Sequence, residues 1–363
     1  MDAKRIAAGA ALVLTVSAGL SGLAAQAQQA AQAAGAVTVS ITPERRTLGA
    51  SDEVAVVVTM TNNSAATAYL LRWQTPFDAV EAPLFEITRD GQPVRYLGRQ
   101  VKRAAPGPGD WIALAPGASR SVRVELSALY QMGTTGAYSI RYRDGALQLF
   151  GTPGGASALA ATPSQAATVW IEGRLPRGML ESAPAPAPAA DGAGLSYSQC
   201  SNPQQQEIAG AVQAAQAMAT DAEGYMQRKM PGLRYTTWFG PVDAGRTATV
   251  ARHFTAIREA FATKPVTVDC SCKESYYAYV YPNQPYKIYV CNAFWSAPLT
   301  GTDSKGGTLV HEMSHFTVVA GTDDWAYGQS AAAALATSNP ARAIDNADSH
   351  EYFGENTPQQ NLR

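Results

Sequence analysis

The chain has 363 residues, of which 46% are hydrophobic and 16% are charged. That length and apolar content are sufficient for two hydrophobic cores, so two domains are expected. Twenty-eight Lys and Arg nearly balance 29 Asp and Glu, and the lack of a basic excess argues against nucleic-acid binding. Beyond the N-terminus no apolar run is long enough to cross a bilayer, so no membrane association is expected after export.

Residues 1–27 have the three parts of a secretory signal peptide. A basic start at Lys4 and Arg5 precedes an apolar run over residues 6–23, and the small-residue pattern ends at Ala27. We expect cleavage near Ala27 and an extracellular protein. A membrane anchor is the alternative, but Gly and Ser interrupt the apolar run and no basic stop follows it.

Residues 28–172 are expected to form an antiparallel β-sandwich, because short β-branched and aromatic runs alternate with turn residues. A hairpin turn is expected at Asp90-Gly91. This stretch contains no Cys and no His, so it is interpreted as a pro or accessory domain that could act as an intramolecular inhibitor or chaperone. The expected strands cover residues 54–58, 69–73, 84–88, 122–126, 138–142 and 168–171.

An Ala/Pro-rich linker is expected over residues 173–196, because the alternating tract at 182–190 cannot form a core. The composition then changes, and residues 197–363 are predicted to form an α+β, helix-rich domain. A helix is predicted over residues 206–228, with Ser201-Asn202-Pro203 as its start. Short strands are predicted over residues 276–281 and 286–290.

All four cysteines lie beyond the linker, at Cys200, Cys270, Cys272 and Cys291. An exported chain meets oxidising surroundings, so two disulfides are expected. A bond between Cys270 and Cys272 is geometrically awkward, which leaves two connectivities open. A zinc site built from these cysteines is disfavoured, because no second close Cys pair accompanies them.

The strongest motif is His311-Glu312-Met313-Ser314-His315, within apolar flanks. On a helix, residues four apart share a face, so both imidazoles can bind one metal ion while Glu312 faces its water. A catalytic zinc site needs a third protein ligand and one open position. The alternative is that these are ordinary helix histidines.

Downstream, Gly321 stands where such a helix is expected to end. The next residues include Asp323 and Asp324, and a turn here can bring one aspartate back to the metal; the spacing does not choose between them. Tyr327 is near enough in sequence to place a phenol beside the open coordination position. The alternative is an exposed acidic turn.

The segment Gly321-Thr322-Asp323-Asp324-Trp325-Ala326-Tyr327-Gly328, together with the upstream motif, resembles the aspzincin metallopeptidases of the deuterolysin group. The resemblance covers residues 197–363 and makes Asp324 the third ligand of one Zn²⁺ per chain. It implies that zinc polarises the scissile carbonyl, that Glu312 takes the proton of the attacking water and passes it to the leaving amine, and that Tyr327 hydrogen-bonds the oxyanion. It also implies disulfides Cys200–Cys270 and Cys272–Cys291.

A second acidic feature lies near the C-terminus. If this segment is helical, Asp348 and Glu351 project to one side and form a short acidic wall suited to an ammonium group. The stretch resembles the peptidyl-Lys metalloendopeptidases, whose matching acids hold the lysine that follows the cleaved bond. Protein or peptide substrates, preferably lysine-containing, are therefore expected; the alternative reading is a solvated helix charge and a cap.

Two other functions stay open at this stage. One is a deuterolysin-like protease of broad specificity, and the other is a secreted binding protein with a vestigial peptidase domain. The intact set of motif residues argues against the second.

The chain has seven lysines, and Lys102 is the only one between the signal and the linker. No lysine lies between Gly173 and Cys200, so a strictly lysine-directed enzyme could not remove its N-terminal domain at the linker.

Overall fold

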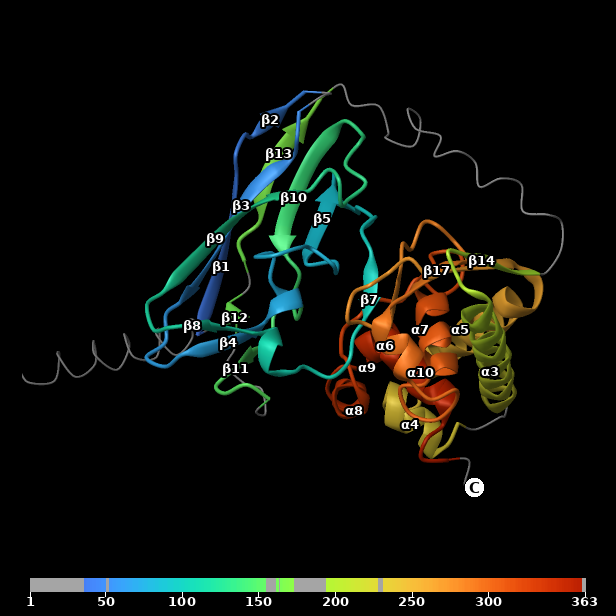
Figure 1. Cartoon of the computed structure of the whole chain (residues 1–363). Coiled ribbons are helices and arrows are strands. Elements are labelled where there is room, and N and C mark those ends of the chain that lie inside the picture. The colour runs from blue at the N-terminus through green and yellow to red at the C-terminus, as the bar shows by residue number, and fades with distance from the viewer. Residues whose placement is uncertain are drawn as a thin grey trace, which may run out of the picture.

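The structure is a computed structural model that describes residues 36–49, 52–154, 161–162, 164–172, 194–227 and 231–360. The predicted signal peptide and residues 173–193 of the predicted linker lie outside the described residues. The described chain forms a β-rich N-terminal part and a helix-rich C-terminal part (Figure 1). Each part has its own hydrophobic core, one drawn from residues 37–171 and the other from residues 208–353.

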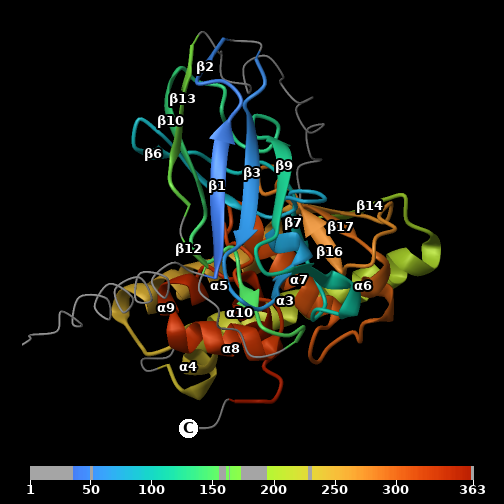
Figure 2. The same ribbon diagram turned by 90° about the vertical axis from the view of Figure 1, so that its left-hand side faces the viewer.

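The described residues of the N-terminal part form three sheets, and three strands of the first sheet run side by side in Figure 2. The first sheet has the order β12 (Ala161–Thr162), β1 (Val37–Pro43), β3 (Ala55–Asn62), β9 (Ser119–Glu125). The second has the order β2 (Thr47–Leu48), β13 (Ala167–Ile171), β10 (Gly136–Tyr142), β5 (Phe85–Arg89), β6 (Gln92–Pro93). The third has the order β11 (Leu149–Phe150), β4 (Ala68–Leu71), β8 (Trp111–Leu114), with short 3-10 turns η1 (Arg72–Gln74) and η2 (Pro108–Asp110) nearby.

Alternating burial explains why these segments are strands. In β10 every second residue is buried in the core, and β3 follows nearly the same pattern. The hairpin turn is present, because Arg89 pairs with Gln92 and the two residues between them, Asp90 and Gly91, have φ values of 49° and 79°. The β-rich N-terminal region is therefore as expected, and its arrangement as a sandwich stays a prediction.

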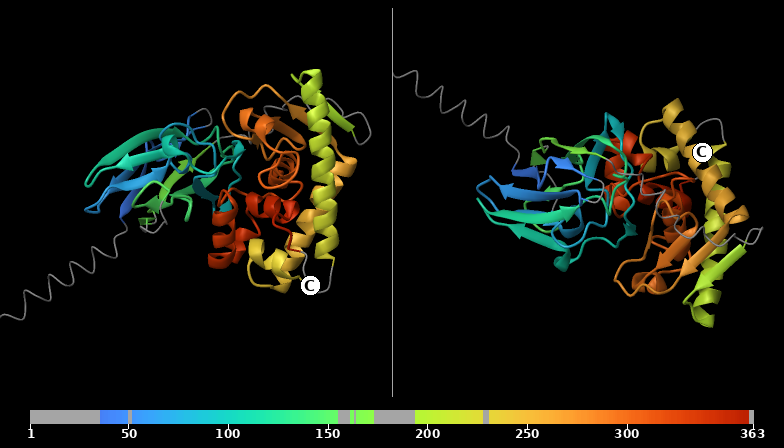
Figure 3. Two further views of the ribbon diagram at one scale, coloured as in Figure 1. Left: turned by 60° about the horizontal axis from the view of Figure 1, so that its bottom comes forward. Right: turned by 90° about the horizontal axis from the view of Figure 1, so that it is seen from above.

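The C-terminal part surrounds a central helix, α7 (Lys305–His315), every residue of which is buried. Helices α3 and α10 pack against α7, and α3 runs along the outside of this part in the left view of Figure 3. The helices are α3 (Asn202–Met226), α4 (Leu233–Phe239), α5 (Ala244–Thr263), α6 (Asn292–Ser296), α8 (Gln329–Ser338), α9 (Pro340–Ala343) and α10 (Ala347–Glu355). The right view of Figure 3 shows the sheet of this part beside the helices.

A strand from the N-terminal part completes that sheet. Its order is β14 (Gly194–Ser198), β15 (Pro265–Asp269), β17 (Lys287–Val290), β16 (Ala278–Val280), β7 (Gln100–Lys102). Strand β7 pairs antiparallel with β16, and it lies between the two parts, next to α7 (Figure 1). The two parts are thus joined by backbone pairing as well as by side chains.

Two expectations differ from the structure. Helix α7 ends at His315 and not at Gly321, because β-branched residues follow and the chain turns, with the N–H groups of Val319, Ala320 and Gly321 donating to the Phe316 carbonyl. Strand β14 begins at Gly194, inside the range expected for the linker, because it pairs with β15. The helix expected over residues 206–228, with Ser201-Asn202-Pro203 as its start, is α3, and its start is confirmed because Ser201 is the N-cap.

Two disulfides fasten the sheet of the C-terminal part. Cys200 is bonded to Cys270 and Cys272 to Cys291, which is the pairing that the resemblance implied. The first bond joins the residue before Ser201, the N-cap of α3, to the residue after β15. The second joins the segment that follows β15 to the residue after β17.

Among the described residues, no helix combines the length and apolarity that crossing a bilayer requires.

Candidate active site

Helix α7 carries three of the predicted site residues on a buried, closely packed element. Its N-cap is Ser304, whose hydroxyl accepts from the Gly307 N–H, and Glu355 at the end of α10 accepts from the Ser304 N–H at 2.8 Å. Gly306 is needed for packing, because a Cβ there would lie 2.9 Å from the Ala214 Cβ on α3. Close contact with α3 and α10 therefore fixes the direction in which the motif side chains point.

Three donor atoms meet beside α7. The His311 and His315 Nε2 atoms lie 3.1 Å apart, and Asp324 Oδ1 lies 3.2 Å from the first and 3.5 Å from the second. Tetrahedral ligands at zinc bond lengths are separated by about 3.3 Å, so these residues fit a zinc ion as three ligands of one site. All three side chains are buried.

Each imidazole is oriented by a partner at its other nitrogen. His315 Nδ1 lies 2.7 Å from the Thr322 carbonyl oxygen, and His311 Nδ1 lies 2.9 Å from Asp348 Oδ1. Because an acceptor fixes the proton on Nδ1, both Nε2 lone pairs face the same point. The sequence did not assign this orienting role to either residue. Thr322 acts through its backbone carbonyl, which no motif identifies, and Asp348 was assigned only to the lysine pocket.

The two neighbouring aspartates have different surroundings. Asp324 faces the histidines, whereas Asp323 forms an ion pair with Arg143 at 2.5 Å and accepts from the Gln100 side chain at 3.1 Å. Asn346 fixes the backbone just after the two aspartates, because its side-chain oxygen accepts from the Trp325 N–H at 2.9 Å. The structure thus brings Asp324, and not Asp323, to the two imidazoles.

Glu312 is fully buried next to this cluster, and burial raises its pKa to about 8 while His311 and Lys102 lower it. A carboxyl group with a pKa near neutrality is suited to accept and release protons. The Tyr327 hydroxyl donates to the Val101 carbonyl oxygen at 3.1 Å. Burial raises the pKa of Tyr327 well above its usual range, so the phenol keeps its proton.

The acidic pair on α10 holds a lysine of the same chain. Lys102 Nζ lies 2.6 Å from Glu351 Oε2, 3.7 Å from Asp348 Oδ1 and 3.3 Å from Asp303 Oδ1. Burial alone would lower the pKa of Lys102, but Asp348, Glu351 and Asp303 outweigh it and raise the pKa well above the usual value. The rings of Tyr277 and Tyr352 lie 5.2 and 5.7 Å from the ammonium group.

Lys102 is the site residue that sequence reasoning missed. The signal was present, because Lys102 is the only lysine in residues 28–172. Its side chain is nevertheless completely buried, in the C-terminal part of the molecule. A buried ammonium group costs several kcal/mol unless charged partners offset the cost, so this contact is specific.

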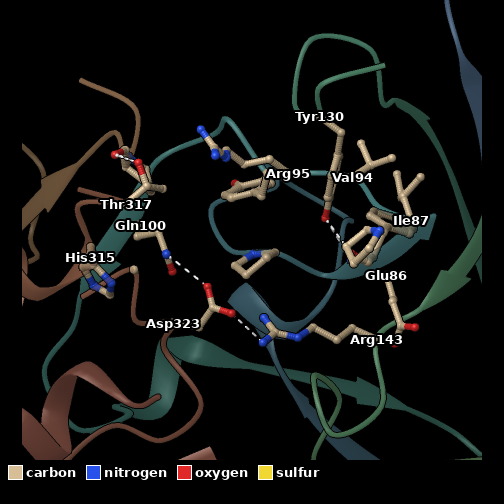
Figure 4. A pocket seen from close by; sticks show the side chains of 16 residues that line it. Glu86, Ile87, Val94, Arg95, Gln100, Tyr130, Arg143, His315, Thr317 and Asp323 are labelled. Atoms are coloured by element: carbon tan, nitrogen blue, oxygen red, sulfur yellow. Dashed lines mark hydrogen bonds and ion pairs between the residues drawn. The ribbon is translucent and has the colours of Figure 1, made fainter. Parts of the chain in front are cut away.

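A cavity of about 310 Å³ lies between the two parts, and His315 is among the residues that line it. Figure 4 shows His315 at one side of it, with Gln100, Asp323 and Arg143 linked along the lower edge and Tyr130 on the side of the N-terminal part. The lining mixes charged and apolar side chains. Its polar groups and size are sufficient for several water molecules beside His315.

Comparisons with known proteins agree with this geometry. A family model described as lysine-specific metallo-endopeptidase, of the aspzincin M35 family, matches residues 226–355. An extracellular protease of Aeromonas hydrophila is 46% identical over 86% of this chain and 91% of its own length. A peptidyl-Lys metalloendopeptidase of Armillaria mellea is 36% identical over 90% of this chain and 95% of its own length.

A solved zinc peptidase of Grifola frondosa matches with 48% identity over 44% of this chain and 99% of that chain, with a TM-score of 0.43. The two long matches span almost the whole of their relatives and nine tenths of this chain. They include both the β-rich part and the part that carries the histidine motif. The chain therefore belongs to the aspzincin family of zinc metalloendopeptidases.

Proposed function

We propose that this protein is a secreted endopeptidase that uses one zinc ion to cleave peptide bonds on the amino side of lysine. The observation that carries this proposal is the position of Lys102. Its ammonium group is held by Glu351 and lies near Asp348, while Tyr327 donates to the carbonyl oxygen of the residue just before it. A lysine in this pocket therefore places the preceding peptide bond beside the proposed metal ligands.

The proposed roles follow from the positions of the side chains. His311, His315 and Asp324 would hold the zinc ion, which supplies Lewis acidity and a lowered water pKa when bound. Glu312 takes the proton of the attacking water and delivers it to the leaving nitrogen. Tyr327 stabilises the negative charge that develops on the carbonyl oxygen.

Specificity is assigned to the acidic pair on α10. Asp348 and Glu351 both approach His311 Nδ1, at 2.9 and 3.3 Å, as well as the lysine ammonium. These carboxylates therefore link substrate recognition to the orientation of a metal ligand. An arginine side chain is longer and planar, so it does not fit a pocket closed around a compact ammonium group equally well.

The N-terminal part is proposed to be a β-sandwich and an intramolecular inhibitor. Strand β7 occupies the edge of β16, and Lys102 occupies the acidic pocket. A substrate would compete for the same edge and pocket.

Secretion is supported by the two disulfides and by the N-terminal signal pattern. The extracellular relative from Aeromonas hydrophila agrees with it.

The test is digestion of a denatured protein of known sequence, with every new N-terminus identified. We expect predominantly lysine at these termini, loss of cleavage with a chelator, and a decrease of about 10²-fold or more in Glu312→Ala. Cleavage before many residue types would reject the lysine pocket and indicate broad specificity. Chelator-resistant cleavage, or full activity of Glu312→Ala, would reject the metallopeptidase assignment of these residues.

A further inference from the structure

Strand β7 crosses the active site in the manner of a substrate. It runs antiparallel to β16, with Val101 opposite Tyr279 and Lys102 opposite Ala278, and the Lys102 carbonyl accepts from the Tyr277 N–H at 3.2 Å. On one side of the Val101–Lys102 bond, Tyr327 donates to the carbonyl oxygen. On the other side, the lysine side chain fills the acidic pocket.

We propose that the Val101–Lys102 peptide bond is the bond that this enzyme cleaves in its own chain. The inference rests on the proposed function. In the reaction, water adds to the Val101 carbonyl carbon and gives a proton to Glu312. The carbon–nitrogen bond then breaks, and the proton passes to the Lys102 nitrogen. The products are a Val101 carboxylate and a new amino terminus at Lys102.

The residues beside the bond hold both new ends in place. Arg99 and Arg103 lie on either side of the bond and both form ion pairs with Glu81. Glu81 also accepts from the Tyr276 hydroxyl at 3.0 Å. The Gln100 side chain donates to the Thr322 carbonyl oxygen at 3.0 Å. These contacts orient the bond before cleavage and keep the two ends from separating afterwards.

The cleaved chain is therefore expected to stay assembled. Strands β1–β6 precede the bond and β8–β13 follow it, yet they share one hydrophobic core. Separation of the fragments would expose that core to water, which is unfavourable in proportion to the apolar area. Self-cleavage thus produces a nicked protein whose fragments co-migrate under native conditions and separate only in denaturant.

The site of cleavage is unique in the N-terminal part. Lys102 is the only lysine in residues 28–172, and no lysine lies between Gly173 and Cys200. An enzyme restricted to lysine can therefore cut the N-terminal part at one bond, and the fold presents that bond to the active site. Because the bond and the site belong to one chain, the rate should not depend on protein concentration.

The experiment follows the purified full chain with zinc by mass spectrometry in denaturant, together with cleavage of an added lysyl peptide. We expect a fragment that begins Lys102-Arg103-Ala104, formed at the same rate after tenfold dilution, and none in Glu312→Ala. Lys102→Gln should also remain intact at this bond, whereas Lys273→Ala, which changes an exposed lysine, should be cut as the wild type is.

A second measurement does not depend on catalysis. In metal-free Glu312→Ala protein, Lys102→Gln should increase the affinity for a labelled lysyl peptide at least tenfold, because the pocket no longer holds a lysine of the chain. If the wild type cleaves the added peptide before lysine but leaves Val101–Lys102 intact, this inference is wrong and the proposed function stands. If the chain is not cut and the added peptide is cut neither by the wild type nor by Lys102→Gln protein, whose pocket is free, the proposed function fails.

Discussion

His311 has two chemically different sides, and this property organises the site. Its Nε2 faces His315 and Asp324, whereas its Nδ1 faces Asp348 and Glu351. The residues grouped around His311 include two sets that could each hold a cation. One set fits a metal through nitrogen and oxygen donors, and the other already holds the Lys102 ammonium. A single imidazole thus separates the proposed catalytic metal from the proposed lysine pocket by the width of one ring.

Tyr327→Phe should lower kcat about 10²-fold with little change in KM, because its hydroxyl contacts the Val101 carbonyl oxygen, and in the proposed reaction the negative charge on that oxygen increases in the transition state. The measurement is steady-state cleavage of a lysyl peptide in the Lys102→Gln background, in which the pocket is free. Tyr197→Phe is the control, since Tyr197 lies on β14 at the other edge of the sheet. An increase in KM with unchanged kcat would show that Tyr327 only binds substrate.

Among the elements, α7 was the most predictable from sequence and β7 the least. The His311/His315 spacing on a helix is a local property, so the motif could be placed with the correct face. Strand β7 has three residues, and its partner β16 lies about 180 positions later, a pairing that no local pattern encodes. The end of α7 was misplaced because Gly321 does stop regular structure, with φ of +64°, but in a turn beyond the helix.

Helix α7 also depends on a partly buried carboxyl group, that of Glu355 on α10, which contacts its N-cap. Glu355 accepts from the backbone of Asp303 and from both the backbone and the hydroxyl of Ser304, the N-cap. Burial and the nearby Glu351 raise the pKa of Glu355 to about 8. In the unfolded chain this carboxyl group titrates near 4.5. The folded state therefore binds more protons between these two pH values, and stability falls as pH rises through this window.

Glu355→Gln should flatten this dependence. The free energy of unfolding of the wild type should decrease between pH 5 and pH 8, and the variant should lose at least about 1 kcal/mol less over that range, since one pKa unit corresponds to about 1.4 kcal/mol. Urea unfolding at several pH values measures the difference. Glu259→Gln, on the exposed face of α5, should keep the wild-type slope, and parallel slopes for all three proteins would contradict the assignment.

At the scale of the whole molecule, the two parts are held together by a compact cluster around Trp325. Arg143 of the N-terminal part lies over the Trp325 ring at 3.4 Å and pairs with Asp323, while Arg342 lies over the same ring at 4.2 Å. Arg342 also donates to the Asp144 carbonyl oxygen. These contacts adjoin the segment that carries Asp324 and Tyr327, so separation of the parts would loosen the active-site turn as well as remove β7.

Arg143→Ala should therefore open the molecule without replacing any proposed catalytic group or any residue of the acidic pocket. In uncleaved Glu312→Ala protein, a labelled lysyl peptide binds only molecules in which Lys102 has left the pocket, so its apparent affinity scales with the open fraction. Loss of a partly buried ion pair and a cation–π contact should raise that fraction about tenfold or more. Fluorescence anisotropy measures the change, and Arg123→Ala, which breaks exposed ion pairs with Glu44 and Glu53 inside the N-terminal part, should leave the affinity unaltered. Equal affinities in all three proteins would mean that the Trp325 cluster does not control access to the pocket.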